Sequence, residues 1–389
     1  MFSQSIGDNG MIFAGLGCPN GCDFCCTSHF FKRRHIRLLP TGRDIFNVMQ
    51  KYRAHNPALK FTVLDEDFLL NKRRAMEFLE CVREARVDFP MFVFSSVKAL
   101  SQYTIEELLE IGILGVWMGY EGRRSNFAKQ QGRPIDELIA DFRAHGINVL
   151  ASMIIGFDYQ TPEIIQEELD SLMALEPTFS QFLIYGPLPG TPFYERITGE
   201  GRLRRKFMEN RDAFYRRCTG FYNVVKHPTM TVPQVQAIQR DCFRQDFDRL
   251  GPSIIRAIES WWLGYQRLKD SANPRLRMCA QRYRKDILDS SPALRPAIWL
   301  GPTAAARQRA RRLLDTIQQG LGLLPVEQRI KSWLAVPLAC WTSLAMKLDA
   351  FHHPRLVRTE YRLRSDAPTR TPPPAESTAV LAPSCLESY

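Results

Sequence analysis

The sequence predicts an α/β protein in which a parallel β-sheet covered by helices is followed by a region made of helices alone. Two observations support this prediction. Between residues 11 and 195, six short apolar runs alternate with longer amphipathic segments, and continuous apolar runs are typical of strands buried on both faces of a parallel sheet. From about residue 200, long amphipathic segments with many basic residues follow one another, which predicts a helical region.

Hydrophobic periodicity predicts six strands and the helices between them. The apolar runs predict strands at residues 11–16, 61–64, 91–94, 116–118, 149–155 and 182–185. Apolar residues at helical spacing predict helices at residues 41–53, 75–82, 104–111 and 135–145. A further helix is expected after Thr161, because Thr is a good N-cap and Pro162 suits the first helical position.

Six strand–helix units fit either an open barrel or a doubly wound sheet, because a closed barrel of this type needs eight units. In both folds, ligands bind at the carboxyl ends of the strands. A cysteine-rich loop lies at the carboxyl end of the first predicted strand. We therefore expect the functional site at this end of the sheet.

The predicted helical region, residues 199–325, carries most of the positive charge. Its periodicity predicts helices at residues 232–250, 253–267, 273–287 and 304–320. Residues 200–312 contain 24 Lys and Arg against 10 Asp and Glu, whereas residues 1–199 contain 20 against 24. A basic helical face fits nucleic acid or anionic lipid, and it equally fits a solvated surface with interspersed charges.

Two further segments follow the helical region. In residues 326–364, the uncharged stretch from Ser332 to Met346 is shorter than the roughly 20 residues of a membrane span, and Pro337 interrupts it. We therefore expect a buried or interfacial helix and no transmembrane span. The last residues are rich in Pro, Ser, Thr and Ala, which predicts a disordered tail. The predicted domains are residues 1–198, 199–325, 326–364 and 365–389.

Four of the ten cysteines lie within residues 18–26. Disulfides explain this cluster poorly, because the spacings close no useful loops and Met1–Gly10 carries no secretory signal. We therefore expect a cytoplasmic chain whose reduced thiolates bind a metal.

Two metal sites fit this loop. Three thiolates can bind three irons of a 4Fe–4S cluster and leave the fourth iron open; the set is Cys18, Cys22 and Cys25. The same cysteines with His29 would form a closed tetrahedral zinc site. Cys26 could replace a neighbouring ligand or be buried as a small apolar side chain.

The C-x3-C-x2-C spacing, with the aromatic Phe24 before its third cysteine and after the first of six strand–helix units, resembles the radical S-adenosylmethionine (SAM) superfamily. The resemblance covers about residues 11–195. It implies an open (β/α)6 barrel of the TIM type and a 4Fe–4S cluster on Cys18, Cys22 and Cys25. It also implies SAM on the unique iron, where an electron from the cluster cleaves the sulfonium to a 5′-deoxyadenosyl radical.

The resemblance continues at the ends of the predicted strands. There it implies cofactor-binding residues in the cysteine loop and at five strand ends: Phe24, Asp65, Glu66, Asp67, Ser95, Ser96, Glu121, Gly156, Pro189 and Gly190. Glu66 is the first choice for contacting the SAM ammonium. Gly122 departs from the family pattern, in which Ser usually follows the glutamate. Taken singly, each of these residues could instead be a helix cap or part of a turn.

The Pro-Gly-Thr-Pro turn at residues 189–192 is similar to that of the cobalamin-binding subgroup of this superfamily. In that subgroup a cobalamin domain normally precedes the radical domain, and the 17 residues before Cys18 are too few to form one. We therefore expect a reaction without cobalamin, a partner that supplies it, or a longer natural N-terminus.

Two functional hypotheses follow. The first is a radical SAM enzyme that takes electrons from a flavodoxin-type or ferredoxin-type donor and modifies a small-molecule or other substrate, with methyl transfer as one outcome. The second is a non-catalytic zinc protein that uses Cys18, Cys22, Cys25 and His29, and whose basic helices bind nucleic acid. The sequence favours the enzyme and does not identify its substrate.

Overall fold

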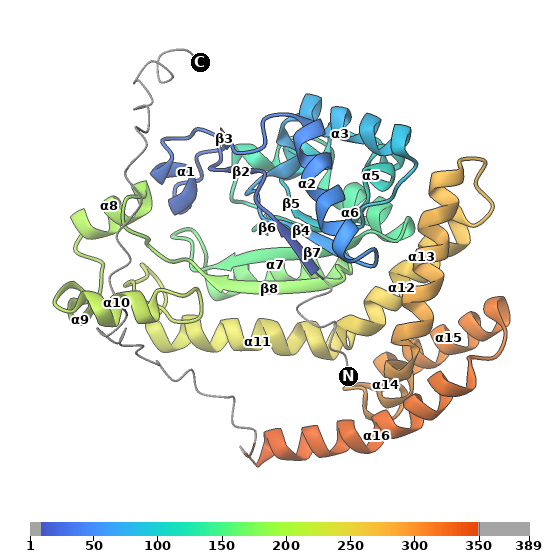
Figure 1. The fold of residues 1–389 in the computed structure, drawn as a ribbon. Helices are drawn as coiled ribbons and strands as arrows, with labels where there is room; N and C mark the ends of the chain where they lie inside the picture. The colour runs from blue at the N-terminus through green and yellow to red at the C-terminus, as the bar shows by residue number, and fades with distance from the viewer. Residues whose placement is uncertain (1–8, 349, 351–389) are drawn as a thin grey trace, which may run out of the picture. The chain divides into compact units, whose positions relative to one another are not determined.

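Six parallel strands form the centre of the fold. In the computed structural model they are β1 (Asn9–Ile12), β4 (Lys60–Val63), β5 (Met91–Phe94), β6 (Ile113–Glu121), β7 (Asn148–Ile155) and β8 (Phe179–Ile184). Their order in the sheet is their order in the chain, so β1 and β8 form its edges. A doubly wound sheet reverses its strand order, whereas this sheet does not, and the fold is therefore an open barrel (Figure 1).

The structure describes residues 9–348 and 350. Described residues up to Trp341 belong to one compact unit, and a second unit begins at Thr342. The predicted tail, residues 365–389, lies outside the described residues, as do residues 349 and 351–364 of the predicted segment 326–364.

Five helices connect the strands and cover the sheet: α2 (Gly42–His55), α3 (Lys72–Ala85), α5 (Ile105–Ile111), α6 (Ile135–Ala144) and α7 (Pro162–Ala174). Right-handed crossovers between strands in sequential order place these helices on one side of the sheet, so its other face becomes the inside of the barrel. The expected cap of α7 is confirmed, because the Thr161 side chain accepts a hydrogen bond from the amide of Ile164.

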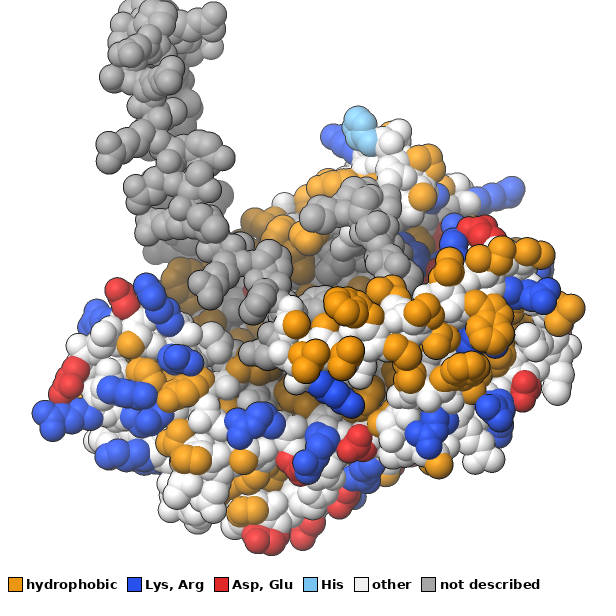
Figure 2. Space-filling view, turned by 90° about the horizontal axis from the view of Figure 1, so that it is seen from below, with side chains coloured by type: hydrophobic (Ala, Val, Ile, Leu, Met, Phe, Trp, Pro, Cys, Tyr) orange, Lys and Arg blue, Asp and Glu red, His pale blue; other side chains and the backbone are white. Residues whose placement is uncertain are grey.

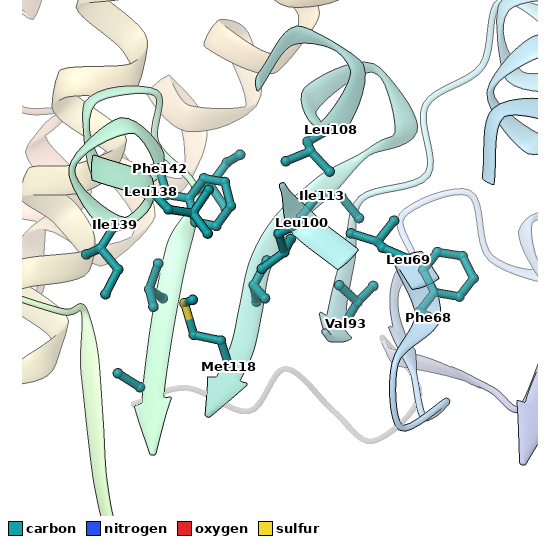
Figure 3. Close-up of a cluster of buried hydrophobic side chains, with 14 of the residues drawn as sticks. Phe68, Leu69, Val93, Leu100, Leu108, Ile113, Met118, Leu138, Ile139 and Phe142 are labelled. Atoms are coloured by element: carbon teal, nitrogen blue, oxygen red, sulfur yellow. The ribbon is translucent and has the colours of Figure 1, made fainter. Parts of the chain in front are cut away.

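The barrel core lies between the sheet and these helices. Figure 3 shows Val93 and Met118 on the strands, with Leu108 and Phe142 reaching them from α5 and α6. All four side chains are fully buried. The strands therefore contain almost continuous apolar sequence, which explains why they could be recognised from sequence alone.

The first predicted strand, residues 11–16, is wrong as a single element. β1 ends at Ile12, and β2 (Gly15–Leu16) leaves the main sheet to pair antiparallel with β3 (Ile36–Arg37). The buried Asp65 carboxylate accepts hydrogen bonds from the amides of Ala14 and Gly15, at 2.7 and 2.8 Å. These amides are therefore withdrawn from the sheet ladder, and β2 and β3 close the base of the cysteine loop.

Helices after β8 complete the compact unit. They are α8 (Pro192–Gly199), α9 (Arg205–Met208), α10 (Arg211–Arg217), α11 (Val232–Leu250), α12 (Ser253–Leu268), α13 (Pro274–Ser290), α14 (Leu294–Leu300) and α15 (Ala304–Leu321). The four helices predicted for this region are confirmed, with bounds that differ by three residues or fewer. Shorter helices also occur: α1 (Cys26–Phe30), α4 (Val97–Leu100) and the 3-10 turns η2 (Phe68–Leu70), η3 (Ala128–Gln130) and η4 (Ser291–Ala293).

Helices α11, α12 and α13 share the barrel's core. Leu250, Leu268 and Tyr283 are buried in the same apolar cluster as the strands. Helix α12 comes so close to the end of α6 that a Cβ on Gly264 would lie 2.7 Å from the backbone of Gly146. The domain boundary at residue 198 stays a prediction, and across it the two regions pack as one core.

Helix α16 (Val326–Lys347) contains the uncharged stretch and Pro337. It is not buried as one alternative expected, because Ile330, Trp333 and Leu334 on it are exposed. Among the described residues, no helix has the length and apolar character needed to cross a membrane.

Candidate active site

A cavity opens at the carboxyl end of the barrel strands. It contains about 850 Å³ of empty space, part of which is open to solvent. Three cysteines line it from the loop after β2: Cys18, Cys22 and Cys25. Residues at the ends of β4, β5 and β6 line the opposite walls, as expected for a barrel of parallel strands.

Glycines and one serine shape the cysteine loop. Gly17 has a φ of +83°, and a Cβ there would lie 2.3 Å from the carbonyl oxygen of Arg34, so no other residue fits without rearrangement. The buried Ser28 hydroxyl donates a hydrogen bond to the carbonyl of Cys18 at 2.6 Å and accepts one from the amide of Gly21 at 3.0 Å. The loop is thus folded back on itself around the cavity.

The thiols of this loop differ in their surroundings. Burial raises the pKa of Cys18 to about 11 and the pKa of Cys22 to about 12. Cys25 is half-buried, whereas Cys26 is exposed and does not line the cavity, with its sulfur 4.0 Å from the Thr27 hydroxyl. Because the two buried thiols do not ionise readily by themselves, they need an adjacent cation, such as iron, to become thiolates.

The donor set fits a cluster better than a single ion. Among the described residues, no group of three or more His, Cys, Asp or Glu side chains converges on a position for one metal ion. A ring nitrogen of His29 also lies 3.0 Å from the carbonyl oxygen of Cys22, so this ring is engaged by the backbone. A 4Fe–4S cluster takes each thiolate on a different iron and therefore fits three cysteines spread around one cavity. The zinc site is not favoured.

Asp67 connects the cysteine loop to the end of β5. Its buried carboxylate accepts hydrogen bonds from the Ser95 hydroxyl at 2.8 Å, from the amide and hydroxyl of Ser96 at 3.1 and 2.6 Å, and from the Asn20 side chain at 3.1 Å. The same Asn20 amide nitrogen lies 3.2 Å from the sulfur of Cys18. Three predicted site residues, Asp67, Ser95 and Ser96, are thus joined in one network that lines the cavity.

Asp65 lies behind the cavity wall. Besides the amides of Ala14 and Gly15, its carboxylate accepts a hydrogen bond from the buried Arg74 guanidinium at 2.9 Å. All of these contacts fix the chain that leads into the cysteine loop, and Asp65 does not line the cavity.

Glu66 lies between these two aspartates and differs from both. Its side chain lines the cavity, and its Oε2 atom is buried without a hydrogen-bond partner. A buried, unpaired carboxylate oxygen is costly, and such atoms call for a specific partner. A bound ligand with a positive charge or an N–H donor would satisfy this atom.

Glu121 ends β6 in a left-handed backbone conformation, with a φ of +60°. It forms an ion pair with Lys129, and both residues line the cavity. Although burial alone would lower it, the charge of Glu121 raises the pKa of Lys129 above its usual value. The Lys129 ammonium also lies 5.5 Å from the centre of the Phe24 ring. Phe24 and Glu121 are therefore brought together by a lysine that the sequence analysis did not select.

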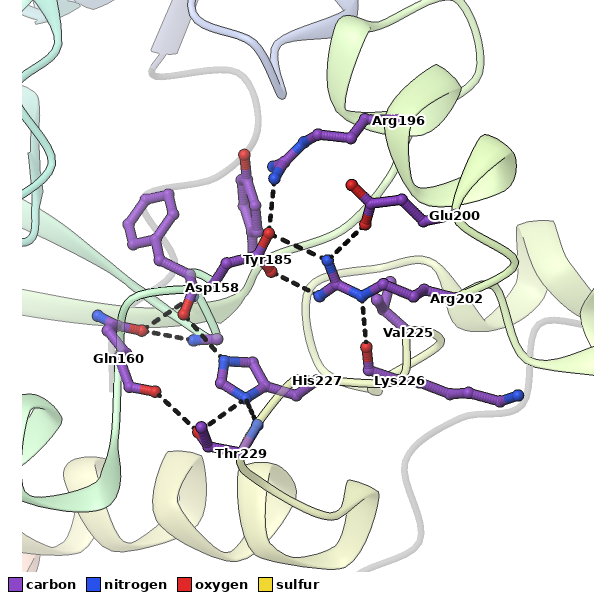
Figure 4. A network of polar contacts seen from close by, with 12 residues as sticks. Asp158, Gln160, Tyr185, Arg196, Glu200, Arg202, Val225, Lys226, His227 and Thr229 are labelled. Atoms are coloured by element: carbon purple, nitrogen blue, oxygen red, sulfur yellow. Dashed lines mark hydrogen bonds and ion pairs between the residues drawn. The ribbon is translucent and has the colours of Figure 1, made fainter.

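Three other predicted site residues do not line the cavity: Gly156, Pro189 and Gly190. Pro189 and Gly190 are exposed, and Gly156 has a φ of +98° with its amide donating to the Gln160 side chain at 2.7 Å. Figure 4 shows the polar network beside this turn, in which Asp158 accepts hydrogen bonds from Arg196 and Arg202. Although burial alone would raise it, these two arginines lower the pKa of Asp158.

A second polar chain crosses the barrel interior and was missed by sequence reasoning. The Trp117 indole donates to the Ser152 hydroxyl at 2.6 Å, and this hydroxyl donates to the Gln181 side chain at 3.0 Å. All three residues line the cavity, and the Trp117 ring stacks on Phe94 with 4.9 Å between ring centres. Polar residues inside otherwise apolar strands were the available signal, since in a barrel such residues face the interior.

Sequence comparisons find relatives over about half of the chain. The chain is 26% identical over 196 residues to an uncharacterised methyltransferase of Pyrococcus horikoshii, a match that covers 48% of this chain and 41% of that one. It is 24% identical over 216 residues to the bacteriochlorophyllide d C-12(1)-methyltransferase of Chlorobaculum tepidum, covering 52% and 45%. The chain therefore spans less than half the length of each of these relatives. No protein-family model matches it.

Among solved structures, the chain is similar to TsrM, a radical S-adenosylmethionine methyltransferase from Kitasatospora setae solved with cobalamin and a [4Fe–4S] cluster bound. The TM-score is 0.45 and the identity 17%, over 72% of this chain and 61% of that one.

The protein is an open (β/α)6 barrel with a cysteine-lined cavity at the carboxyl ends of its strands. Over about half of its length, the chain is thus similar in sequence to proteins described as methyltransferases.

Proposed function

We propose that this chain is the barrel-containing part of a cytoplasmic radical SAM enzyme whose cluster is held by Cys18, Cys22 and Cys25. The observation that supports this most directly is the composition of the cavity. Three cysteines from one loop line it together with Glu66, a carboxylate with a buried and unpaired oxygen. The cysteines supply a site for iron, and the carboxylate supplies a site for a positively charged ligand.

When bound, the cluster and SAM supply reductive cleavage of the sulfonium to a 5′-deoxyadenosyl radical. The residues of this chain position these groups. Glu66 would accept a hydrogen bond from the SAM ammonium, and the Asp67 network keeps the cysteine loop fixed against the end of β5. The ion pair of Glu121 and Lys129 adds no net charge to the cavity wall and braces Phe24 beside the cluster loop.

The substrate enters from the open mouth of the cavity, and the stacked Phe94 and Trp117 rings offer it an apolar wall. We propose methyl transfer as the reaction, because both of the sequence relatives described above are methyltransferases. Cobalamin from a further domain or a partner is compatible with this reaction, and a flavodoxin-type or ferredoxin-type protein is the proposed electron donor.

The test is anaerobic reconstitution with iron and sulfide, followed by addition of SAM and dithionite. We expect broad absorption near 400 nm from the cluster and formation of 5′-deoxyadenosine. Cys25→Ala loses both signals, whereas Cys26→Ala, a matched change at the next residue, retains them. A colourless wild-type protein after reconstitution, or equal loss of iron in both variants, would refute the proposal. Methyl-labelled SAM, with and without methylcobalamin, separates methyl transfer from other radical reactions.

A further inference from the structure

Helix α16 has its large apolar side chains on its exposed face. Val326, Ile330, Trp333, Leu334 and Trp341 are each more than half exposed. Their spacing of three, four and seven residues places them along one side of the helix. On the opposite side, Ser332 is buried, while Ala335 and Ala339 are half-buried. This orientation is the reverse of the usual one, in which the large apolar residues of a surface helix face the core.

Helix α14 extends this exposed surface. The Trp299 ring is 54% exposed and lies edge-on to Trp333, with 5.9 Å between ring centres. We call these six residues the α14–α16 apolar face: Trp299, Val326, Ile330, Trp333, Leu334 and Trp341. Figure 2 shows hydrophobic side chains gathered along α16 on the side of the molecule seen from below. Single exposed apolar residues are common, whereas a contiguous group of this kind marks an interaction surface.

The surroundings of the apolar face are basic. Residues 293–347 contain eight Lys and Arg against two Asp and Glu. The Arg295 guanidinium lies 3.9 Å from the centre of the Trp333 ring, so a cation lies directly against an exposed aromatic ring of the apolar face. Arg311 and Arg312 on α15 and Arg329 on α16 are exposed as well.

We propose that the α14–α16 apolar face docks on the surface of an anionic lipid bilayer, with α16 lying in the plane of the membrane. Tryptophan rings beside cations suit the boundary between acyl chains and phosphate headgroups, where the ring is apolar on one side and the guanidinium meets phosphate. The part of α16 that carries the face, residues 326–341, is about 24 Å long. Its single-sided apolar character fits shallow insertion, since no described helix can cross a membrane.

The test uses the full chain and vesicles sedimented by centrifugation. One set of vesicles contains equal parts of phosphatidylglycerol and phosphatidylcholine, and the other contains phosphatidylcholine alone. We expect at least tenfold tighter binding to the anionic vesicles, with weaker binding as salt rises from 50 to 500 mM, because salt screens the charges at the headgroups. The tryptophan emission of the bound protein should shift to shorter wavelength as Trp333 and Trp341 leave water.

Two variants separate docking from a general loss of fold. Trp333→Ser combined with Trp341→Ser should weaken vesicle binding at least tenfold and leave the melting temperature unchanged, since both rings are exposed. Tyr215→Ser on α10 is the matched control, because this ring is also more than half exposed and lies on another helix. It should bind vesicles as the wild type does.

Three results would overturn the proposal. They are equal or absent binding to the two kinds of vesicle, unchanged binding of the double variant, and a wild-type dimer that the double variant dissociates. The last result would identify the occupant of the face as a second copy of this chain. None of these measurements depends on the cluster or on SAM, so they are independent of the proposed catalytic function.

Discussion

Changing Glu66 to Gln tests the assignment of the SAM-binding carboxylate. The substitution keeps the size and shape of the side chain, removes its charge and replaces one acceptor oxygen with a donor group. Because the Glu66 Oε2 atom is buried and has no partner in the protein, no existing hydrogen bond is lost at that atom. The change therefore acts on the bound ligand and hardly on the protein itself.

The size of the effect follows from the burial of that oxygen. A carboxylate and an ammonium about 4 Å apart attract each other by about 4 kcal/mol at an effective dielectric constant of about 20, and desolvation cancels part of this attraction. Charge-assisted hydrogen bonds are worth about 1.5–3 kcal/mol net. Since about 1.4 kcal/mol corresponds to a factor of ten, Glu66→Gln should weaken SAM binding by roughly ten- to a hundredfold.

The assay is a titration of SAM into the reduced, anaerobic protein, followed by the change in the electron paramagnetic resonance signal of the cluster. Glu80→Gln is the matched control, because Glu80 is an exposed glutamate on the outer helix α3. The iron content of both variants should equal that of the wild type, since no cysteine has changed.

The stability of the ligand-free Glu66→Gln variant gives a second readout, because a ligand-binding and a structural role of Glu66 predict stability changes of opposite sign. Removal of a buried, unpaired charge should leave the free energy of unfolding unchanged or raise it by up to about 1 kcal/mol. A structural carboxylate would instead lose stability on the same change. An unchanged SAM affinity, together with lower stability, would show that Glu66 supports the fold and does not contact the cofactor.

Four further predictions follow from contacts described above. Alanine variants at the three cavity cysteines should each lose the cluster, measured as iron and acid-labile sulfide per chain. Cys26→Ala should keep most of its iron, because this thiol is exposed and does not line the cavity. Cluster loss only in Cys26→Ala would reverse the ligand assignment. Arg74→Met leaves the buried Asp65 charge unpaired and should reduce the free energy of unfolding in urea by about 3–5 kcal/mol, and a loss below 1 kcal/mol would contradict the structural role of this pair. Burial lowers the pKa of His145 below its usual 6.5, so its contribution to stability is present above pH 6.5 and is lost as the pH falls below that value. His145→Gln should therefore lose less stability than the wild type between pH 7 and 5. An equal loss in both proteins would refute the assignment of this pH dependence to His145. Deletion of residues 365–389 should leave the melting temperature and SAM binding unchanged, and a large drop in melting temperature would show that this segment docks on the rest of the chain.

The sequence predicted the strands and the cysteine loop well because both depend on local patterns. Met91–Phe94 is a strand with the predicted bounds, and the predicted helix 232–250 is α11. These segments combine strong periodicity with clear boundaries, such as the Thr231 cap, so tertiary contacts did not need to override local preference.

The difference between neighbouring acids could not be predicted in the same way. Asp65, Glu66 and Asp67 are consecutive, yet the first binds the backbone before the cysteine loop, the second lines the cavity with an unpaired oxygen, and the third joins Asn20 to Ser95 and Ser96. Alternation around a strand end predicts only that consecutive side chains point in different directions. It does not identify the partners of Asp65 and Asp67, among them residues 14–20 and 95–96, which only the folded chain brings near.

Residues that act through long-range pairing were missed for the same reason. Lys129 lies in the short 3-10 turn η3, which carries no motif, and it reaches Glu121 and Phe24 only in the folded barrel. Trp117, Ser152 and Gln181 come from three strands that are adjacent only in the sheet. Polar residues in apolar strands are the general signal for such interior contacts.

The shared core of the strands and of helices α11–α13 limits how this protein can be divided. A fragment that ended at residue 198 would remove Leu250, Leu268 and Tyr283 from the interior and leave the apolar surface that they cover in contact with water. Such a fragment would aggregate or be degraded before it could bind iron, even though it contains every predicted cofactor residue. By the same logic, exchanging the barrel with that of a relative would require the matching helices to be transplanted with it.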